Sequence, residues 1–352
     1  AENEVLMKVA IITDQHFGMR KGSQIFHDYM NKFYEEVFFP FLEKNKITTV
    51  LDLGDTFDNR KSIDFWSLDW AKKNYYDILA NRGIQVYTVV GNHTAYFKNT
   101  LGINAINLLL QEYDNVHLIE RPETIEVGGL DICFIPWICV DNETDTYEEI
   151  SNTSANICMG HLELSGFEAH VGYYMDHGMS RDVFSKFKKV FSGHFHHRSH
   201  SDNIYYLGNP YQMYWNDFGD VRGFHLFDTQ STKLKFIPNP FKMFEKIYYD
   251  DSTMSPDEID TDQFKDKFVK LIVEKRTNYY AYDNLIERLY QTGVHDLKII
   301  DNSHEEINPS GDIEIEGTLS FLEKYVEEID YEDKDTLKSI IGSIYSESLQ
   351  IE

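Results

Sequence analysis

The stretch ITTVLDLGDTFD, residues 47–58, is a short run of β-branched and apolar residues that ends in a glycine and two aspartates. Runs of this length and composition are typical of buried strands. LMKVAIIT (6–13) and IQVYTVVG (84–91) follow the same pattern, and residues 23–45 and 62–82 between the runs carry helical spacing with charged faces. Strand–helix–strand alternation of this kind predicts a layered α/β domain.

The pattern changes in the second half of the chain. Further strand-like runs lie at 130–136, 155–161, 189–194, 203–210 and 222–228. Because few helices separate these runs, we expect a second, more antiparallel sheet that faces the first. Residues 239–262 are polar, acidic and turn-rich, and 267–301 are predicted to form a small β-α-β unit.

Side chains that commonly bind metals recur just beyond the ends of five predicted strands. They are Asp14 and His16, Asp55 and Asp58, Asn92 and His93, His161, and His194 and His196. The carboxyl ends of strands in layered α/β proteins converge on one crevice, so these turns should meet. In an extended chain, both side chains of Asp-x-His and of His-x-His would point to the same side, which leaves His197 pointing elsewhere.

More than one interpretation fits each motif alone. A single Asp or His at such a turn more often forms the turn or makes an ordinary polar contact than binds a metal. The histidines of FSGHFHH (191–197) are compatible with a metal site, a pH-sensitive surface cluster or coincidence. The recurrence of five motifs in order, each at a strand exit, favours the metal site. Mixed oxygen and imidazole donors suit manganese, iron or zinc better than calcium.

The order D-x-H, G-D-x-F-D, G-N-H, G-H and G-H-x-H across residues 7–230 resembles the calcineurin-like metallophosphoesterase superfamily. More narrowly, GDTFDNRKS, FIPWIC, GHLELSGF and SGHFH are similar to motifs of the SbcD-type nuclease subunits of double-strand-break repair complexes, and most of all to their T-even phage branch. The resemblance implies an α/β fold: a layered β-sandwich flanked by helices, with a small α+β cap domain and C-terminal helices.

The same resemblance implies two divalent metal ions, expected to be Mn²⁺. One ion would be held by Asp14, His16, Asp55 and His196. The second would be held by Asp55, Asn92, His161 and His194, so that Asp55 bridges. His93 matches the histidine that meets the scissile phosphate and can protonate the leaving oxygen. The family usually has an acidic residue where this chain has Thr94, and that carboxylate would ordinarily orient His93; another acid such as Asp58 could substitute.

The resemblance also divides the chain and implies its function. We expect a nuclease domain at 7–240, a DNA-positioning cap at 262–301, an acidic linker at 302–317 and a helical ATPase-binding segment at 318–352. The implied activity is Mn²⁺-dependent exonuclease and endonuclease cleavage of DNA in recombination and repair, by a dimer that works with an SMC-like ATPase. The alternatives are a phosphatase or small-substrate phosphodiesterase, which the extra C-terminal residues disfavour, and a weakened scaffold, which the full ligand set disfavours.

Composition limits the other function classes. The net charge of −26 argues against DNA binding through a broad basic face, so metals and a partner would have to supply positive charge. The basic segments 20–23, 59–62 and 186–189 could contact phosphates or be ordinary surface charge. No run of 18 apolar residues predicts a membrane span. The acidic start is no secretory signal, Met7 is the expected natural start, and Cys133, Cys139 and Cys158 fit buried thiols in the cytoplasm.

Overall fold

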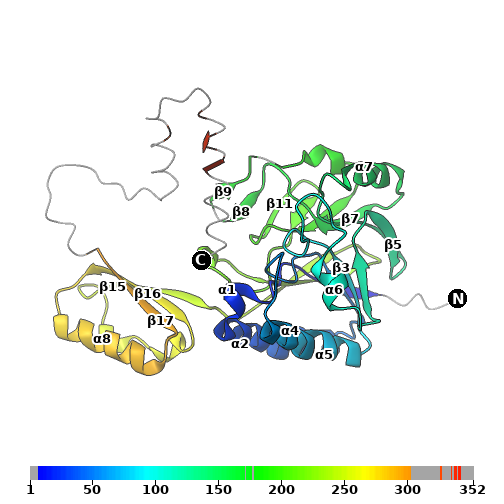
Figure 1. Cartoon of the computed structure of the whole chain (residues 1–352). Coiled ribbons are helices and arrows are strands. Elements are labelled where there is room, and N and C mark those ends of the chain that lie inside the picture. Colours follow the sequence, from blue (N-terminus) through cyan, green and yellow to red (C-terminus); the bar gives the residue numbers. More distant parts are fainter. Residues whose placement is uncertain are drawn as a thin grey trace. The chain divides into compact units, whose positions relative to one another are not determined.

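The computed structural model describes residues 7–176 except 171, residues 178–302, and six single residues near the C-terminus (Figure 1). Those six are Val326, Lys334, Leu337, Lys338, Ile340 and Ile341. The chain divides into two compact units. The larger unit runs to Tyr211 and includes Gly219–Phe241, and the smaller unit comprises Gln212–Phe218 and the chain from Lys242 onward. Apart from Asn302 and the six residues, the expected acidic linker and C-terminal helices lie outside the described residues.

The first sheet of the larger unit has the strand order β14-β13-β1-β2-β3-β4. Its strands are β1 (Lys8–Ile12), β2 (Thr49–Asp52), β3 (Gln85–Val89), β4 (Val116–Ile119), β13 (Gly223–Asp228) and β14 (Leu234–Pro238). β1 to β4 are parallel to one another, whereas β13 runs antiparallel to both β1 and β14. The three strands predicted in the first half are therefore adjacent and parallel, so their carboxyl ends lie at one edge.

The second sheet has the order β11-β12-β10-β7-β6-β5. Its strands are β5 (Glu123–Val127), β6 (Leu130–Ile135), β7 (Ile157–His161), β10 (Lys189–Gly193), β11 (Ser199–Ser201) and β12 (Ile204–Tyr206). The inner pairs are parallel, and only the edge strands β5 and β11 pair antiparallel. The prediction of a more antiparallel second sheet is therefore wrong. The chain returns to the same end of the sheet between β6 and β7 and between β7 and β10, which makes these strands parallel.

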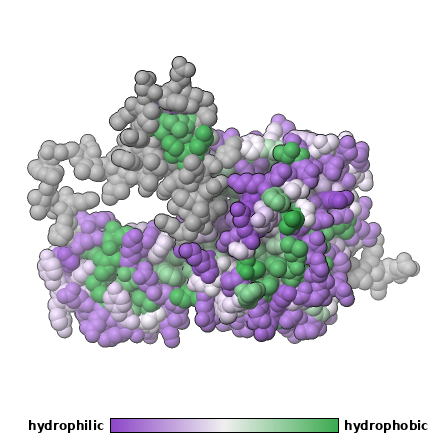
Figure 2. Space-filling view, viewed as in Figure 1, coloured by the Kyte–Doolittle hydropathy of each residue, from purple (hydrophilic) through white to green (hydrophobic). Residues whose placement is uncertain are grey.

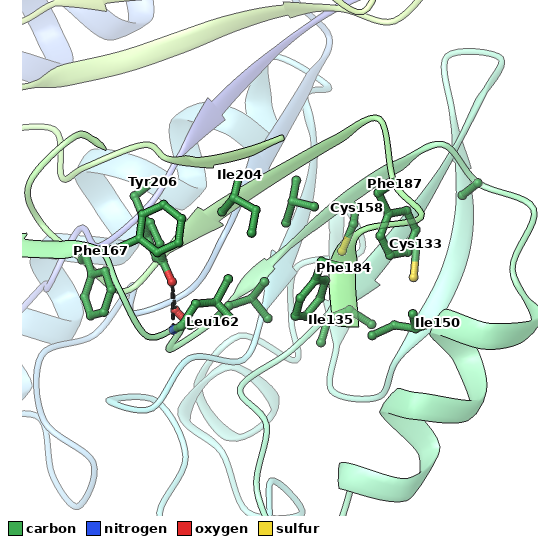
Figure 3. Packing of buried hydrophobic residues seen from close by; sticks show 14 of the residues in the cluster. Cys133, Ile135, Ile150, Cys158, Leu162, Phe167, Phe184, Phe187, Ile204 and Tyr206 are labelled. Carbon is green, nitrogen blue, oxygen red and sulfur yellow. Dashed lines mark hydrogen bonds between the residues drawn. The ribbon is translucent and has the colours of Figure 1, made fainter. Parts of the chain in front are cut away.

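The main core joins the inner faces of the two sheets. Both sheets contribute to one buried cluster that includes Val9, Leu51, Val89, Phe134, Met159 and Phe191. A second cluster covers the outer face of the second sheet, where Ile150 of α7 (Glu143–Asn152) packs near Phe184 and Phe187 (Figure 3). In that cluster the Tyr206 hydroxyl donates to the carbonyl oxygen of Leu162 at 3.0 Å, which fixes the chain just after His161.

Helices flank the first sheet. The two predicted helical stretches are confirmed as α2 (Gln24–Phe33) with α3 (Phe39–Lys44), and α4 (Phe65–Ala71) with α5 (Asp77–Asn81). A π-helical turn links each pair, at Tyr34–Phe38 and at Lys72–Tyr76. Asp64 caps α4 by accepting a hydrogen bond from the Ser67 backbone N–H at 2.8 Å. The shorter elements are α1 (Met19–Gly22), α6 (Ala105–Leu109), β8 (Glu168–His170) and β9 (Tyr173–Tyr174).

The smaller unit contains a parallel three-stranded sheet in the order β15-β16-β17. β16 (Phe268–Lys275), α8 (Tyr279–Thr292) and β17 (Asp296–Asp301) confirm the predicted β-α-β succession. β15 (Phe244–Asp250) is an additional strand inside the segment expected to be turn-rich. α8 begins at the side-chain cap of Asn278 and ends at Gly293, whose φ of 87° favours glycine.

The viewed faces of both units are largely hydrophilic, with hydrophobic residues gathered in patches (Figure 2). In the described part of the chain, no helix is both long enough and apolar enough to cross a lipid bilayer.

Candidate metal centre

The predicted metal-binding side chains meet in two clusters at the strand ends. The first cluster consists of Asp14, His16 and His196, and the second consists of Asp55, Asn92, His161 and His194. They come from the turns after β1, β2 and β3 of the first sheet and from the ends of β7 and β10 of the second. The predicted site residues are therefore close together, as the convergence of strand ends requires.

The first cluster brings two imidazoles and a carboxylate together. The Nε2 atoms of His16 and His196 lie 3.1 Å apart, and each lies about 4 Å from Asp14 Oδ1, at 4.0 and 3.9 Å. On its other side, the His16 ring contacts Asp58, whose Oδ1 is 3.0 Å from His16 Nδ1. Asp58 thus orients His16 so that Nε2 faces the cluster, in the way that carboxylates position metal-binding histidines.

The second cluster is centred on His161 and Asn92. His161 Nε2 lies 3.1 Å from Asp55 Oδ2 and 2.9 Å from Asn92 Oδ1, which is also 3.0 Å from His194 Nδ1. The backbone carbonyl of Leu53 accepts a hydrogen bond from His161 Nδ1–H at 2.7 Å. This contact leaves Nε2 to face the cluster. Asp55 therefore sits in the second cluster, and its predicted contact with an ion in the first stays a prediction.

The turns that carry these residues are left-handed and not extended. Asp14, His16, Asp55 and His194 have φ values of 54°, 49°, 52° and 86°. Non-glycine residues seldom adopt this conformation, and it is enriched at functional sites. A left-handed turn, and not an extended segment, sends His194 to the second cluster and His196 to the first, so both side chains face the metal centre as predicted.

Two glycines let the backbone approach these carboxylates. A Cβ atom at Gly91 would collide with the Asp55 carboxylate, and one at Gly193 would collide with the Thr13 hydroxyl and crowd Asp14. Only glycine fits where strand exits come this close. These two glycines therefore form tight strand exits at the metal centre.

Electrostatics in the clusters favours added positive charge. Burial alone would raise the pKa of Asp55, but nearby His161 and His93 hold it well below its usual range. Burial opposes charge on His161, yet Asp55 raises the pKa of that imidazole to about 9. Burial, and then the neighbouring His16, hold the pKa of His196 well below normal, so it is a neutral imidazole. Facing imidazole nitrogens at 3.1 Å and buried carboxylates, without thiolates, fit divalent cations of the manganese, iron or zinc type.

His93 lies beside the first cluster, with its ring centroid 4.9 Å from that of His16. Its Nδ1 is 2.6 Å from the backbone carbonyl of Asp58, and its backbone N–H donates to Asp55 Oδ1 at 2.8 Å. Asp58 therefore supplies the missing support for His93, but with its backbone oxygen, because its carboxylate contacts His16. Burial lowers the pKa of His93.

Thr94 has a different role from the acid it replaces. It is fully buried, and its hydroxyl accepts from the Gly91 N–H at 2.9 Å while lying 3.1 Å from the Gly91 carbonyl. Thr94 thus closes the turn that carries Asn92 and His93 and does not contact the His93 ring within hydrogen-bonding distance.

Gln15 ties the first cluster to a buried hydrogen-bond network. Its side-chain amide donates to Asp52 Oδ2 at 3.0 Å, and its side-chain oxygen accepts from the Tyr34 hydroxyl at 2.6 Å. The Tyr211 hydroxyl donates to the Gln15 carbonyl at 2.6 Å, and Thr56 donates to Asp52 at 2.6 Å. Burial raises the pKa of Asp52 to about 7. The network therefore joins the turn after β1 to the turn after β2.

Sequence reasoning assigned no role to two residues that contact the second cluster. The Trp137 ring centroid lies 5.0 Å from that of His194, and Glu163 Oε2 lies 3.6 Å from His194 Nε2. Trp137 lies in the motif FIPWIC and Glu163 in GHLELSGF. The resemblance of these motifs to the family could therefore have pointed to both residues. His197, set aside as a bystander, contacts Asp220 at 2.7 Å and lies in neither cluster.

Comparison with known proteins agrees with this geometry. The calcineurin-like phosphoesterase family matches residues 7–198. Exonuclease subunit 1 of enterobacteria phage T4 is 33% identical over 357 aligned positions, which cover 98% of this chain and all of that protein. The comparison with solved structures includes an archaeal phosphodiesterase at 12% identity. The match covers 66% of this chain and all of that chain, with a TM-score of only 0.34.

These matches confirm the expected α/β fold and enzyme class, a metal-dependent phosphoesterase. The family implies divalent metal ions, and the two clusters supply suitable donors. The chain belongs to the calcineurin-like phosphoesterase family.

Proposed function

We propose that this phosphoesterase is a Mn²⁺-dependent DNA nuclease subunit that cleaves phosphodiester bonds in recombination and double-strand-break repair. The observation that carries the proposal is the pair of donor clusters in a chain that is 33% identical, over 98% of its length, to a protein named exonuclease subunit 1. A phosphatase would not require this likeness to extend through the smaller unit, and a non-catalytic scaffold would not require the full set of donor residues.

The proposed ligands follow the two clusters. Asp14, His16, Asp55 and His196 hold one ion, and Asp55, Asn92, His161 and His194 hold the other. When bound, two such ions neutralise phosphate charge and lower the pKa of an attacking water. The buried network around Gln15 and Asp52 and the Asp58 carboxylate keep the ligand side chains oriented.

His93 is the proposed proton donor to the leaving oxygen. Because its Nδ1 is held by the Asp58 carbonyl at 2.6 Å, Nε2 is the atom that can face a substrate. Burial lowers the pKa of the His93 imidazole, but an anionic phosphodiester beside the ring favours its protonated form. The ring can then transfer that proton as the P–O bond breaks.

A pocket next to Asp58 supports a nucleotide substrate. It has a volume of about 230 Å³ and includes Arg60 and Lys61, together with the more apolar Tyr96, Ile103 and Leu108. Cationic groups that can contact phosphates, beside an aromatic and apolar wall that can contact a base or sugar, suit a nucleic acid better than a small phosphomonoester.

We also propose the assembly that the resemblance implies. The nuclease domain spans 7–240, the cap at 262–301 positions DNA, the linker spans 302–317, and helices within 318–352 bind an SMC-like ATPase. Phe65, which is 92% exposed, offers apolar surface for dimerisation within that complex. DNA as the substrate, and three buried free cysteines, fit a cytoplasmic location.

Cleavage of end-labelled linear DNA with Mn²⁺, with and without the cognate ATPase, tests the proposal. We expect DNA degradation and no comparable hydrolysis of p-nitrophenyl phosphate. Hydrolysis of the phosphomonoester without DNA cleavage would identify a phosphatase, and no hydrolysis of either substrate under any divalent metal would identify a scaffold.

A further inference from the structure

Three lysines form a row across the sheet of the smaller unit. The strand register places Lys246 of β15 opposite Lys270 of β16, and Lys270 opposite Lys298 of β17. Neighbouring strands lie about 4.8 Å apart, so the three side chains stand next to one another. Val269 and Leu271, which flank Lys270 on β16, form the buried cluster with α8. The lysine row therefore lies on the face of the sheet opposite α8 (Figure 1).

This arrangement is electrostatically unfavourable. Like charges directly opposite each other on adjacent strands destabilise a sheet. Two other cations of the unit have carboxylate partners: Lys267 pairs with Glu245 at 3.4 Å and Arg276 with Asp301 at 3.2 Å. Within the described ranges, no carboxylate forms an ion pair with any lysine of the row. Partial burial, and then the two neighbouring ammonium groups, lower the pKa of Lys270.

Aromatic rings hold two of the ammonium groups in place. Lys270 Nζ lies 4.1 Å from the ring centroid of Trp215, and Lys246 Nζ lies 4.6 Å from that of Phe218. Both rings belong to Gln212–Phe218, which is part of this unit. Cation–π contacts attract an ammonium group but bring no negative charge. The row is thus positioned without being neutralised.

The row of side chains beside the lysines is aromatic and apolar. It consists of Tyr248, Ile272 and Ile300, and the Tyr248 ring is 53% exposed. Surfaces that bind single-stranded nucleic acid combine cations along the phosphate backbone with aromatic rings on which bases stack. In a chain of net charge −26, such a local positive site is what a polyanion would need in order to approach.

We infer that this face binds single-stranded DNA, with Lys246, Lys270 and Lys298 contacting phosphates and Tyr248 stacking on a base. The inference rests on the proposed function, because DNA is the substrate proposed for the metal centre. A local violation of the rules of sheet stability, with no compensating carboxylate among the described residues of the unit, is expected at functional surfaces.

The test compares full-length, Mn²⁺-loaded protein with a variant in which Lys246, Lys270 and Lys298 are replaced by Gln. The probe is a fluorescein-labelled 20-nucleotide oligothymidylate with phosphorothioate linkages, which resists cleavage, and the readout is anisotropy over a range of salt concentrations. Each lost phosphate contact lowers the salt slope by about 0.7, so we expect the slope to fall by about 2 and the affinity to fall about tenfold or more. Lys298→Gln alone should lower the slope by about 0.7.

The matched control replaces Lys44, Lys233 and Lys265, which are exposed and lie elsewhere, by Gln with the same change in charge. It should bind the oligonucleotide like the wild type. The row variant should also melt no lower than the wild type, because like-charge repulsion is relieved. Unchanged affinity and slope in the row variant, equal loss in the control, or displacement of the oligonucleotide by polyglutamate as readily as by unlabelled oligothymidylate would overturn the inference. Failure of the wild type to cleave ordinary DNA would overturn only the proposed function, since binding is measured without cleavage.

Discussion

The metal centre and the lysine row both gather titratable side chains, but they differ in the charges that they bring together. In the larger unit, buried imidazoles and carboxylates alternate, and Asp58, Leu53 and Asn92 each provide a hydrogen-bonding partner. In the smaller unit, three ammonium groups stand side by side, and two of them rest on aromatic rings, with no carboxylate paired to them in the part of the unit that the structure describes. The first arrangement suits small cations that complete it, and the second suits a polyanion.

The comparison also teaches where sequence carries information. The metal centre is built from short motifs such as DQH and GHFH, whose members are adjacent in the chain. The lysine row is built from three strands, and only their register makes neighbours of residues that are far apart in sequence. Chemistry within a motif is therefore visible in the sequence, and chemistry created by strand pairing is not.

Replacing Asp55 by Asn should separate the two regions most sharply. Loss of the proposed bridging charge should remove both ions and reduce cleavage by more than the roughly 10²–10⁴-fold expected for a lost general acid. The salt dependence of single-stranded DNA binding should not change, because the lysine row is intact. Metal analysis and anisotropy measure the two effects, and two ions still bound to Asp55→Asn would contradict the assignment.

His93→Ala should leave both regions assembled while removing the proton donor. Metal content and oligonucleotide affinity should match the wild type, and cleavage should fall by about 10²–10⁴-fold. A substrate with a good leaving group, such as a p-nitrophenyl phosphodiester, should recover much of the lost rate because it needs no proton. Equal loss of metal and activity would instead make His93 a ligand.

Asp52→Asn should weaken the metal centre from a distance. Asn keeps the shape of Asp52, but one of its two terminal groups is an NH2, so it cannot accept from Gln15 and Thr56 on one side and from the Gly54 N–H on the other. Loss of such an outer partner typically costs about 10–100-fold in metal affinity or activity. Raising the Mn²⁺ concentration should restore cleavage, and Asp114→Asn, an exposed substitution, is the control. A loss that Mn²⁺ does not rescue would exclude a positioning role.

Thr94→Asp should have the smallest effect on chemistry and should be harmful. If His93 lacked support, a restored carboxylate at position 94 would raise the cleavage rate. In the structure, Thr94 is fully buried and closes a turn with Gly91, while His93 already has the Asp58 carbonyl. Burying an unpaired polar group typically costs about 1–3 kcal/mol, so the melting temperature should fall. Faster cleavage by Thr94→Asp would show that His93 lacks support.

Much of the fold could be predicted because local patterns determine it. The buried strands around Val50, Val86 and Ile157 and the helices that flank the first sheet follow from apolar runs and helical spacing. The edge strands β4, β5 and β14 were missed, since their half-exposed residues lack a continuous apolar run. The direction of strands in the second sheet depends on long connections, which no local pattern encodes.

The site could be predicted as a set of residues but not as a geometry. Asp14, His161 and His196 were found because they lie at strand exits in a familiar order. The left-handed turns at Asp14 and His194, and the backbone contact of Asp58 with His93, could not be read from residue types. The backbone supplies these features, and it becomes visible only in the folded chain.

The central claim is that two ions bind in the two clusters with Asp55 shared between them, and anomalous diffraction from Mn²⁺-soaked crystals tests it most directly. The account predicts two anomalous peaks per chain. One should lie among Asp14, His16 and His196, the other should lie among Asn92, His161 and His194, and an oxygen of Asp55 should be within bonding distance of each. A single peak, or two peaks of which only one contacts Asp55, would contradict it.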